Sequence, residues 1–417
     1  MKQYDVIVIG GGPAGIAAAV SANDENSKVL LIEREARLGG ILKQCIHDGF
    51  GLIRFGEQLS GPEYAERYIK ELNKRDIDVL TLSFVTKISK TKENLFYVHI
   101  VNKKGVDTFL TKALVLAMGC RERTSKQISI HGTRPSGVFT AGTAQHYTNL
   151  LGELPTKECV ILGSGDIGLI MARRLTLEGA RVIGVFEAKN TPSGLTRNIH
   201  QCLYDYNIPL HLSYTVTRIF GEDRLTAVEI MKVDENLKPI KNTEQIIKCD
   251  ALILSVGLIP ENEVAESLGV PLDNRTNGPV CDGQYMTLID GVFSCGNALH
   301  VNDLVDYVSE NAEQAGKNAA RYVNSDRCLI NINSSDDFLY TVPQKLDINQ
   351  NNSNVIVYFR SRKNREKTKF VISVDGKEFF SKKYSFLRPP EMERVEVDFN
   401  SFNLTKSSNI EFNLVNF

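Results

Sequence analysis

The sequence predicts an α/β protein made of two nested domains with parallel sheets, followed by a small C-terminal all-β domain. Two observations carry this prediction. A strand, a glycine-rich turn, a helix and a second strand ending in an acid occur twice, from residue 4 and again from residue 159. After about residue 336, short strands with alternating polar and apolar residues follow one another. The repeated unit is typical of a Rossmann-like dinucleotide-binding fold.

Composition limits the classes of function that need to be considered. The 417 residues suggest two or three domains, and 49 basic against 50 acidic residues give a net charge of −1. This balance offers no electrostatic case for binding nucleic acid or an anionic membrane. The start, MKQYDVIVIGGG, lacks the features of a signal peptide, and no apolar run approaches the ~20 residues of a transmembrane helix. We therefore expect a cytoplasmic protein without a transmembrane segment.

The cysteines give no sign of a metal site. There are eight, scattered along the chain, and no two are arranged as a CxxC pair. Zinc ribbons and internal iron–sulfur sites need such clustered ligands. We expect no metal in this chain, and reduced cysteines.

The first repeat carries the motif GxGxxG at Gly10, Gly12 and Gly15, between the strand YDVIVIG and a helix of small residues. Such glycines allow a tight turn, close approach of the backbone to a pyrophosphate, and packing of helix on strand. Glu33 ends the next strand, 18 residues after Gly15. A carboxylate at that place can bond a ribose 2′-hydroxyl.

The second repeat has the same pattern at Gly163, Gly165 and Gly168, and Glu187 ends its second strand. No arginine cluster follows Glu187 that would hold a 2′-phosphate, so the sequence favours NAD over NADP. Lys189 could still meet a phosphate, and a vestigial packing unit is the alternative to a second nucleotide site.

The domains are expected to be nested. We predict a first nucleotide-binding domain from residues 1–120 and 278–330, with a second inserted at 121–277. A helix is predicted from near Asp303 to Tyr322. The β-rich domain is predicted at 335–417, with a hairpin turn at Asp375-Gly376.

Several motifs in this order resemble the two-dinucleotide-domain flavoproteins related to glutathione and thioredoxin reductases. The motifs are GGGPAG, Glu33, Ala117-Met118-Gly119, GSGDIG, Glu187, Ser255-Val256-Gly257 and GVFSCGN. The resemblance spans about residues 1–325 and implies FAD in the first domain and NAD(P)H in the second. Asn297 stands where that family usually has an aspartate that positions the ribityl chain.

Candidate cofactor-binding residues follow from the motifs and the resemblance. For FAD they are Gly10, Gly12, Pro13, Ala14, Gly15, Glu33, Arg34, Gly40, Ile41, Val85, Ala117, Gly119, Gly296 and Asn297. For NAD they are Gly163, Gly165, Asp166, Ile167, Gly168, Glu187 and Gly257.

A narrower resemblance rests on GGILKQCIHDGFGL, GPEYAER, RPSGVFTAG and CGNALHVNDLVDYVSE. These stretches are similar to FAD-dependent oxidoreductases that accompany a glycerol-3-phosphate dehydrogenase. That group in turn resembles subunits of opine oxidase, hydrogen cyanide synthase and dye-linked proline dehydrogenase. The resemblance implies a partner flavoprotein dehydrogenase subunit, with an iron–sulfur protein as a further candidate and a homo-oligomer also open.

Cys45 lies where disulfide reductases of the glutathione type carry two redox cysteines, but it stands alone. A packing role in the flavin pocket is favoured over a sulfenic acid cycle. Lys43 is a candidate for placing positive charge near reduced flavin, and His47 lies in the same loop. His300 is a candidate acid, with capping as the alternative.

The expected function is that of an FAD-dependent NADH:acceptor oxidoreductase. Hydride would pass between NAD(H) and FAD, and electrons would be exchanged with the partner dehydrogenase subunit. An autonomous NADH oxidase or peroxidase, working through bare flavin or Cys45, is the first alternative. A non-catalytic subunit that binds FAD for structural reasons is the second.

Overall fold

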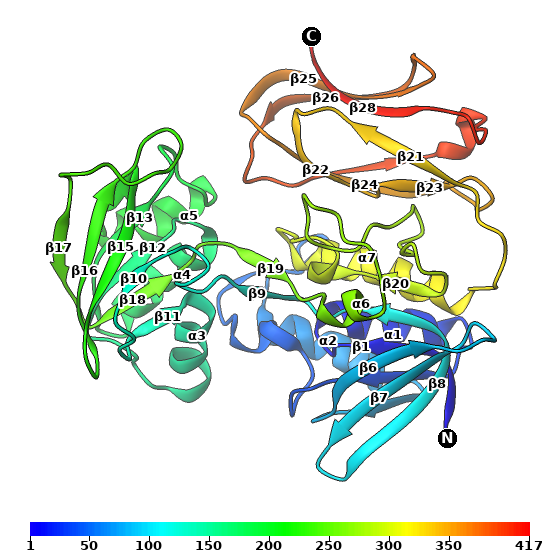
Figure 1. Cartoon of the computed structure of the whole chain (residues 1–417), viewed down its shortest axis with the longest axis horizontal. Coiled ribbons are helices and arrows are strands. Elements are labelled where there is room, and N and C mark those ends of the chain that lie inside the picture. The colour runs from blue at the N-terminus through cyan, green and yellow to red at the C-terminus, as the bar shows by residue number, and fades with distance from the viewer. The chain divides into compact units, whose positions relative to one another are not determined.

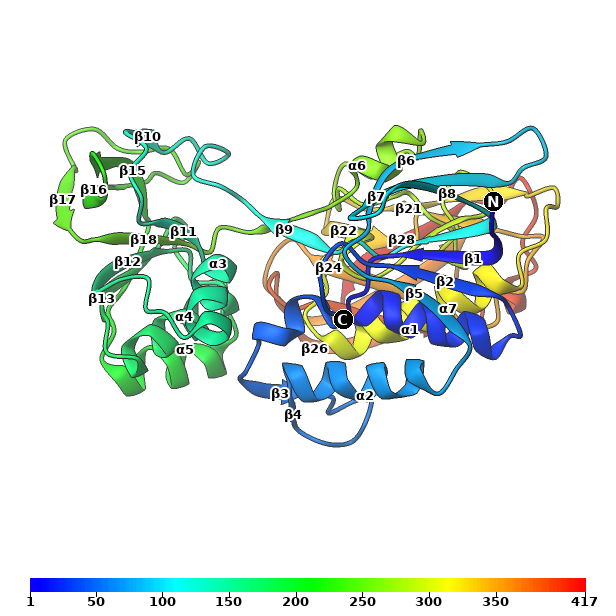
Figure 2. The ribbon, with the colours of Figure 1, turned by 90° about the horizontal axis from the view of Figure 1, so that it is seen from below.

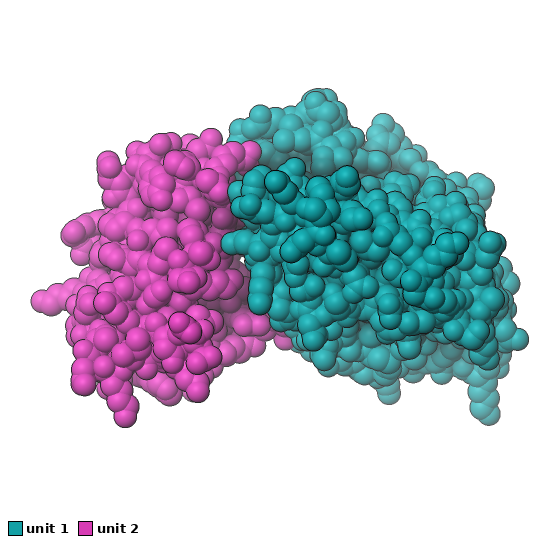
Figure 3. Space-filling model, turned by 90° about the horizontal axis from the view of Figure 1, so that it is seen from above, with its two compact units in different colours: residues 1–120, 260–417 teal, residues 121–259 magenta.

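The computed structural model describes all 417 residues and divides into two compact units (Figure 3). Unit 1 contains Met1–Cys120 and Pro260–Phe417, and unit 2 contains Arg121–Ile259. The chain crosses between them in two short strands, β9 (Cys120–Glu122) and β19 (Leu258–Pro260), which pair with each other. The nested arrangement of two Rossmann-like folds and a β-rich tail agrees with the sequence prediction.

The return of the chain to unit 1 comes earlier than the boundary expected at residue 277. Ala265 and Val270 are fully buried in the core on one face of the unit 1 sheet, with Val264 and Leu268 packed beside them. Apolar contacts therefore assign residues 260–277 to the first unit. The short segment carries no repeat motif, so nothing in its residues indicated which sheet it covers.

Unit 1 is built on a seven-stranded sheet of order β5-β2-β1-β8-β7-β6, with β20 also paired to β8. The strands β5, β2, β1, β8 and β20 are parallel, and β6 and β7 extend the sheet as an antiparallel meander. Parallel strands covered on both faces need continuous apolar runs, which YDVIVI supplies. The bounds are β1 (Gln3–Ile9), β2 (Val29–Ile32), β5 (Ile77–Leu80), β6 (Phe84–Lys90), β7 (Phe96–Asn102), β8 (Gly105–Leu116) and β20 (Val292–Ser294).

Three helices cover one face of this sheet (Figure 2). They are α1 (Pro13–Asp24), α2 (Gly61–Asn73) and α7 (Val305–Ala320). The helices α1 and α7 pack very closely, because a Cβ on Gly316 of α7 would lie 2.1 Å from the carbonyl oxygen of Ala18 in α1. The predicted last helix is therefore present, and it begins two residues after Asp303.

The C-terminal β domain is a sandwich of a five-stranded sheet, β23-β21-β28-β25-β26, and a three-stranded sheet, β22-β24-β27 (Figure 1). Asp375 and Gly376 both have positive φ (51° and 81°) and form the predicted hairpin turn between β25 and β26. The bounds are β21 (Leu329–Ser334), β22 (Phe338–Val342), β23 (Lys345–Asp347), β24 (Val355–Ser361), β25 (Arg365–Val374), β26 (Lys377–Leu387), β27 (Glu393–Val397) and β28 (Ile410–Asn416).

The three-stranded sheet of this sandwich is buried on both faces. Val355, Val357 and Phe359 point into the sandwich core. Tyr340 and Tyr358 belong instead to the core that α1 and α7 form with the unit 1 sheet. The β domain thus covers an apolar face of the α/β part of unit 1.

Unit 2 repeats the architecture with a five-stranded parallel sheet of order β11-β18-β12-β13-β14. A four-stranded sheet, β10-β15-β16-β17, adds a second layer in which β15, β16 and β17 are antiparallel and β10 is parallel to β15; the sequence pattern did not indicate this layer. The bounds are β10 (His131–Gly132), β11 (Val138–Thr140), α3 (Ala141–His146), β12 (Glu158–Leu162), α4 (Asp166–Leu177), β13 (Arg181–Glu187), α5 (Thr196–Cys202), β14 (Leu210–Leu212), β15 (Tyr214–Gly221), β16 (Leu225–Lys232), β17 (Gln245–Lys248) and β18 (Ala251–Leu254).

The remaining elements are short. They are η1 (Gly40–Gln44), β3 (Asp48–Phe50), β4 (Leu59–Ser60), η2 (Tyr147–Leu151), η3 (Tyr204–Tyr206), α6 (Glu263–Ser267), η4 (Gly296–Ala298) and η5 (Phe399–Phe402). The longest helix of the fold is α7, with 16 residues. None of the helices has both the length and the apolar character needed to span a membrane.

Candidate dinucleotide-binding sites

The glycine loop of unit 1 joins β1 to α1, and each of its three positions is occupied by glycine for a different physical reason. Gly10 has φ +105°, and a Cβ there would lie 2.4 Å from the carbonyl oxygen of Ala117. A Cβ on Gly15 would lie 1.7 Å from the carbonyl oxygen of Gly10. Gly12 has an ordinary φ of −76°, and beyond its own chain neighbours the nearest atom to its Cβ position is the Cα of Gly40, at 3.8 Å. The fold requires the outer two glycines, whereas the middle one leaves open space at the start of α1.

The loop between β12 and α4 in unit 2 shows the same division. Gly163 has φ +99°, and its Cβ would lie 2.0 Å from the carbonyl oxygen of Ser255. The Cβ of Gly168 would lie 2.6 Å from the carbonyl oxygen of Gly163. Gly165 has φ −66°, and its nearest neighbour would be 3.7 Å away. A glycine that neither conformation nor packing demands, at the N-terminus of a helix, fits the close approach of a pyrophosphate.

The acid that ends the second strand of each repeat is hydrogen-bonded to its own glycine loop. The carboxylate of Glu33 accepts the N–H of Gly11 at 2.6 Å and the N–H two residues after itself at 2.7 Å. The carboxylate of Glu187 accepts the N–H of Ser164 at 3.0 Å and again the N–H two residues later, at 3.1 Å. Both acids are 6% exposed. The sequence indicated a ribose as the ligand of these acids. It did not indicate that each acid also holds its own glycine loop, through the same pair of backbone hydrogen bonds in both units.

Ser164 strengthens the arrangement in unit 2. Its hydroxyl donates to Glu187 at 2.6 Å and accepts the N–H of Ser193 at 2.9 Å. The serine stands in the x position of GxGxxG, where the motif itself sets no residue type. No signal in the sequence could have singled it out.

Two further glycines of unit 1 converge on the first turn of α1. Gly40 has φ +55°, and its Cβ would lie 2.9 Å from the Cα of Gly12. Gly296 has φ +60°, and its Cβ would lie 2.7 Å from the Cβ of Ala14. The N–H of Gly296 donates to the buried Asn311 side chain at 2.8 Å. The structure therefore brings together Gly10–Gly15, Gly40, Ala117 and Gly296, although they are up to 286 residues apart in the chain.

Asn297 and Gly119 lie at the edge of this cluster. The side-chain oxygen of Asn297 accepts both the backbone N–H and the side-chain amide of Asn302, at 3.0 and 3.3 Å. The amide in the place of a carboxylate thus stabilises the turn that leads to α7. Gly119 has φ +76° and no side chain within 4 Å of its Cβ position.

Three other candidates for FAD are placed differently. Arg34 forms an ion pair with Glu261 at 3.0 Å, and its side chain is 53% exposed. Val85 is buried in the core on the other face of the sheet, so only its backbone faces away from that core. Ile41 is 58% exposed.

The additional NAD candidates serve the start of α4. Asp166 is the first residue of that helix, and its carboxylate accepts the N–H of Leu195 at 2.9 Å and the amide of Asn198 at 2.7 Å. Ile167 packs beside the apolar core of unit 2. Gly257 has φ +103° and only the Arg123 side chain near its Cβ position, at 3.9 Å.

Cys45 is packed against the start of α2. A Cβ on Gly61 would lie 2.8 Å from the Cβ of Cys45, and the Gly61 N–H donates to the Cys45 carbonyl oxygen at 2.9 Å. The thiol donates to the carbonyl oxygen of Ile41 at 3.3 Å. Burial raises the pKa of the Cys45 thiol to about 12. At neutral pH this cysteine is a thiol and not a thiolate, which is the reactive form.

The two other candidates in this loop have local partners. The ammonium of Lys43 donates to the carbonyl oxygen of Arg37 at 2.9 Å. A ring nitrogen of His47 lies 3.1 Å from the carbonyl oxygen of Asp48, and the ring packs against Phe50 at 5.0 Å. Both side chains therefore stabilise the loop around Cys45.

His300 is fully buried between aromatic rings of the β domain. Its ring centroid lies 4.9 Å from that of Tyr358 and 5.8 Å from that of Tyr340. Burial, with repulsion from Arg360 as a second cause, lowers the pKa of His300 to about 3. The imidazole is therefore neutral throughout the physiological range.

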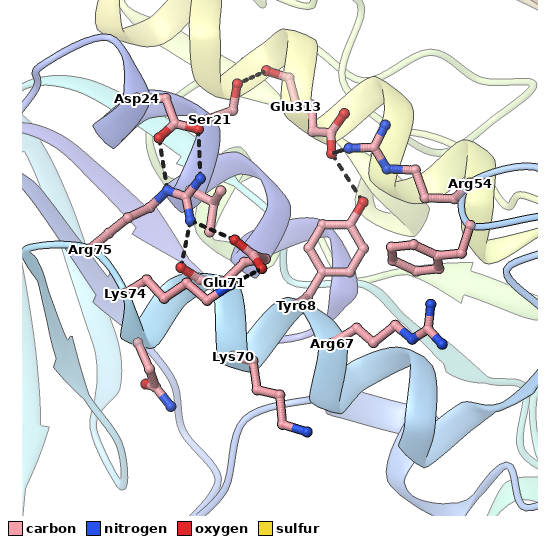
Figure 4. Close-up of a pocket in the computed structure, with 13 residues that line it drawn as sticks. Ser21, Asp24, Arg54, Arg67, Tyr68, Lys70, Glu71, Lys74, Arg75 and Glu313 are labelled. Atoms are coloured by element: carbon pink, nitrogen blue, oxygen red, sulfur yellow. Dashed lines mark hydrogen bonds and ion pairs between the residues drawn. The ribbon is translucent and has the colours of Figure 1, made fainter.

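A groove of about 840 Å³ opens between α1, α2 and α7, beside the last turns of α1 and not at its glycine loop (Figure 4). Five cations line it, but each has a carboxylate partner. Arg75 holds Asp24 through two hydrogen bonds, and Arg54 and Tyr68 both bind Glu313. Each cation has a carboxylate partner, and the pairs of Arg75 with Asp24 and of Arg54 with Glu313 tie neighbouring segments of the groove together.

Comparisons with known proteins agree with the twin loops. The family model described as pyridine nucleotide-disulphide oxidoreductase matches residues 4–319. Hydrogen cyanide synthase subunit HcnB of Pseudomonas protegens is 27% identical over 63% of this chain, and the match spans 58% of that protein. A subunit of the opine oxidase of Agrobacterium tumefaciens is 24% identical over 80% of this chain and 67% of its own length. A ferredoxin–NADP reductase of Leuconostoc mesenteroides is 25% identical over 74% of this chain and 88% of its own length.

Solved structures share the fold. Thioredoxin reductase of Lactococcus lactis superposes with a TM-score of 0.63 at 22% identity, covering 76% of this chain and 98% of that one. Thioredoxin reductase of T. acidophilum superposes with a TM-score of 0.62 at 20% identity, covering 77% of this chain and 99% of that one. The matched family model and the two glycine loops lead to one conclusion. The chain belongs to the pyridine nucleotide-disulphide oxidoreductase family, whose members are FAD-dependent NAD(P)H oxidoreductases.

Proposed function

We propose that this protein is an FAD-dependent NADH:acceptor oxidoreductase that exchanges electrons with a partner dehydrogenase subunit. The observation that supports two nucleotides in one chain is the pair Gly12 and Gly165. Each leaves open space at a helix N-terminus that the fold itself does not require. Bound FAD would supply the acceptor for a hydride from nicotinamide.

The residues of each unit have defined tasks in this proposal. The first N–H groups of α1 and α4 would bind the pyrophosphates, because the N-terminal end of a helix carries partial positive charge. Glu33 and Glu187 hold the loops in shape with one face of the carboxylate and leave lone pairs for a ribose hydroxyl. Gly40 and Gly296 would let the cofactor pass close to the backbone.

We propose NAD as the preferred nucleotide of unit 2. Glu187 is followed by Ala188 and Lys189, without an arginine, so a 2′-phosphate would meet a carboxylate and only one nearby cation. The ferredoxin–NADP reductase among the relatives is named for the other nucleotide. The preference must therefore be measured.

The electrons would leave the flavin without a disulfide. The thiol of Cys45, with a pKa near 12, is poorly suited to the nucleophilic chemistry of the disulfide reductases. We likewise assign His300 a packing role, since it stays neutral down to about pH 3.

A partner protein is the proposed outlet. The relatives HcnB and the opine oxidase protein are both named as subunits. The motifs around Cys45 and His300 resemble companions of a glycerol-3-phosphate dehydrogenase, so we propose that enzyme as the partner, with an iron–sulfur protein as a further component.

Substituting the two middle glycines one at a time tests the two nucleotide sites independently. We expect Gly12→Leu to purify without flavin, because the side chain fills the space at the start of α1. Gly165→Leu should keep full flavin content but lose bleaching of the flavin band by NADH. Each variant is the other's control for folding. Full flavin content in Gly12→Leu would remove the basis for the FAD site.

Nucleotide preference is tested by anaerobic reduction. We expect NADH to bleach the flavin band faster than NADPH in the parent protein. Glu187→Gln keeps an acceptor for Ser164 but removes the charge that repels a 2′-phosphate. In this variant the ratio of the reduction rate with NADH to that with NADPH should be about tenfold smaller than in the parent protein, which corresponds to ~1.4 kcal/mol of barrier. Equal rates with the parent protein would contradict the preference.

Replacing the single cysteine of the flavin loop tests its role. In Cys45→Ser, NADH should reduce the bound flavin at a rate within about tenfold of the rate in the parent protein. This corresponds to a change of less than ~1.4 kcal/mol in the barrier. Because burial holds the thiol protonated, alkylation of Cys45 at a pH of about 7.5 should also be much slower than that of a free thiol. Loss of all turnover with a flavin that still bleaches would instead indicate sulfenic acid chemistry.

The partner is tested by co-expression with a glycerol-3-phosphate dehydrogenase. We expect a stable complex in which glycerol 3-phosphate drives formation of NADH. In the same complex Gly165→Leu should abolish NADH formation while the two proteins still co-purify. If the isolated chain binds no partner and consumes NADH with dioxygen at a rate on the order of tens per second, within the ordinary range for enzymes, the oxidase alternative holds.

A further inference from the structure

The turn from Asn297 to Leu304, which we call the η4–α7 turn, lies between the first nucleotide loop and the β domain. On the side of the loop, Gly296 at the start of η4 approaches Ala14 in the first turn of α1 so closely that a Cβ would clash at 2.7 Å. The turn also sets where α7 begins, at Val305. Its position therefore determines one wall of the cluster around Gly12.

On its other side, the η4–α7 turn inserts a side chain into the β domain. The ring of His300 is fully buried beside Tyr358 of β24 and Tyr340 of β22. Neither ring nitrogen has a hydrogen-bond partner. Shape and aromatic packing hold this histidine, so the slot fixes the position of the turn without using its polarity.

Arg360 of β24 supplies the polar contacts of the same turn. Its guanidinium forms an ion pair with the Asp303 carboxylate and donates to the carbonyl oxygen of Val301 at 3.4 Å. Its Nε donates to the hydroxyl of Tyr340 at 3.0 Å. The second oxygen of Asp303 accepts the backbone N–H of Met392, also in the β domain, at 2.6 Å. One arginine thus joins two residues of the turn, Val301 and Asp303, to the sandwich.

We propose that Arg360 is a positioning residue for the flavin, and that the C-terminal β domain is a working part of the flavin site. This inference rests on the proposed function, in which FAD lies at the loop Gly10–Gly15. A partly buried ion pair with several hydrogen bonds fixes geometry more firmly than an exposed one. Without it, the η4–α7 turn would keep the packing of His300 but lose its ion pair to the sandwich, so the turn and the partially positive N-terminus of α7 would be held less firmly.

The chain contains a matched control, a second arginine of the same three-stranded sheet that forms an ion pair close to the η4–α7 turn. Arg394 of β27 binds the Glu310 carboxylate of α7 through two hydrogen bonds, at 2.7 and 2.6 Å. Glu310 lies seven residues after Asp303, about two helical turns further along. Arg394 therefore anchors the β domain to α7 itself, whereas Arg360 binds the η4–α7 turn that precedes the helix.

The experiment compares Arg360→Met with Arg394→Met in the full chain. We measure the melting temperature, the dissociation constant for FAD by titration of the apoprotein, and the midpoint potential of the bound flavin. Both variants should lose thermal stability to a similar extent. Only Arg360→Met should raise the FAD dissociation constant at least tenfold and shift the midpoint potential to a more negative value, because the positive end of α7 is less well held.

Equal effects of the two variants on FAD affinity and potential, or no effect of either, would overturn the positioning role and leave the β domain as a cover. Asp303→Asn keeps the acceptor for the Met392 N–H and removes the charge, so it should change FAD affinity and midpoint potential in the same direction as Arg360→Met. If Arg360→Met does not fold, Asp303→Asn takes its place in the comparison with Arg394→Met. A parent protein that binds no FAD at all would overturn the proposed function itself, which is a different result.

Discussion

Two buried carboxylates shape the nucleotide-binding loops on which the rest of the structure depends. Glu33 and Glu187 each accept the N–H that follows the first glycine of their loop, at 2.6 and 3.0 Å. A charged acceptor makes such hydrogen bonds short and strong, and burial makes them costly to lose. The loops keep the helix N-termini open because these acids, and not the ligand, hold the backbone in place.

The sequence predicted the parts of each unit that are local. Glycine spacing, the apolar strands and the terminal acids lie within about 30 residues of one another, and both repeats fold as expected. The sequence could also place the Asp375-Gly376 turn, because two successive residues with positive φ strongly favour that pair. Local patterns were sufficient wherever the deciding contact was close in the chain.

The parts that the sequence could not supply depend on distant residues. Gly40 and Gly296 meet at α1 only in the folded chain, and Ser164 occupies a position that the motif leaves undefined. The C-terminal β domain, which the sequence indicates only as a series of strands, buries His300 and holds Asp303. A histidine and a cysteine that chemistry alone marks as candidates prove to be packed side chains with pKa values far from neutrality.

The insertion of unit 2 between Cys120 and Pro260 sets the order in which the protein can assemble during synthesis. The inserted unit has its whole core within one stretch of chain, so it can fold as soon as that stretch leaves the ribosome. The surrounding unit cannot, because β20, α7 and the sandwich come after residue 290. Its sheet and α1 must wait, with apolar surface exposed, for the last third of the polypeptide. Aggregation of nascent chains is therefore most dangerous for unit 1, and the C-terminal β domain that completes this unit also ends the exposure of its apolar surface.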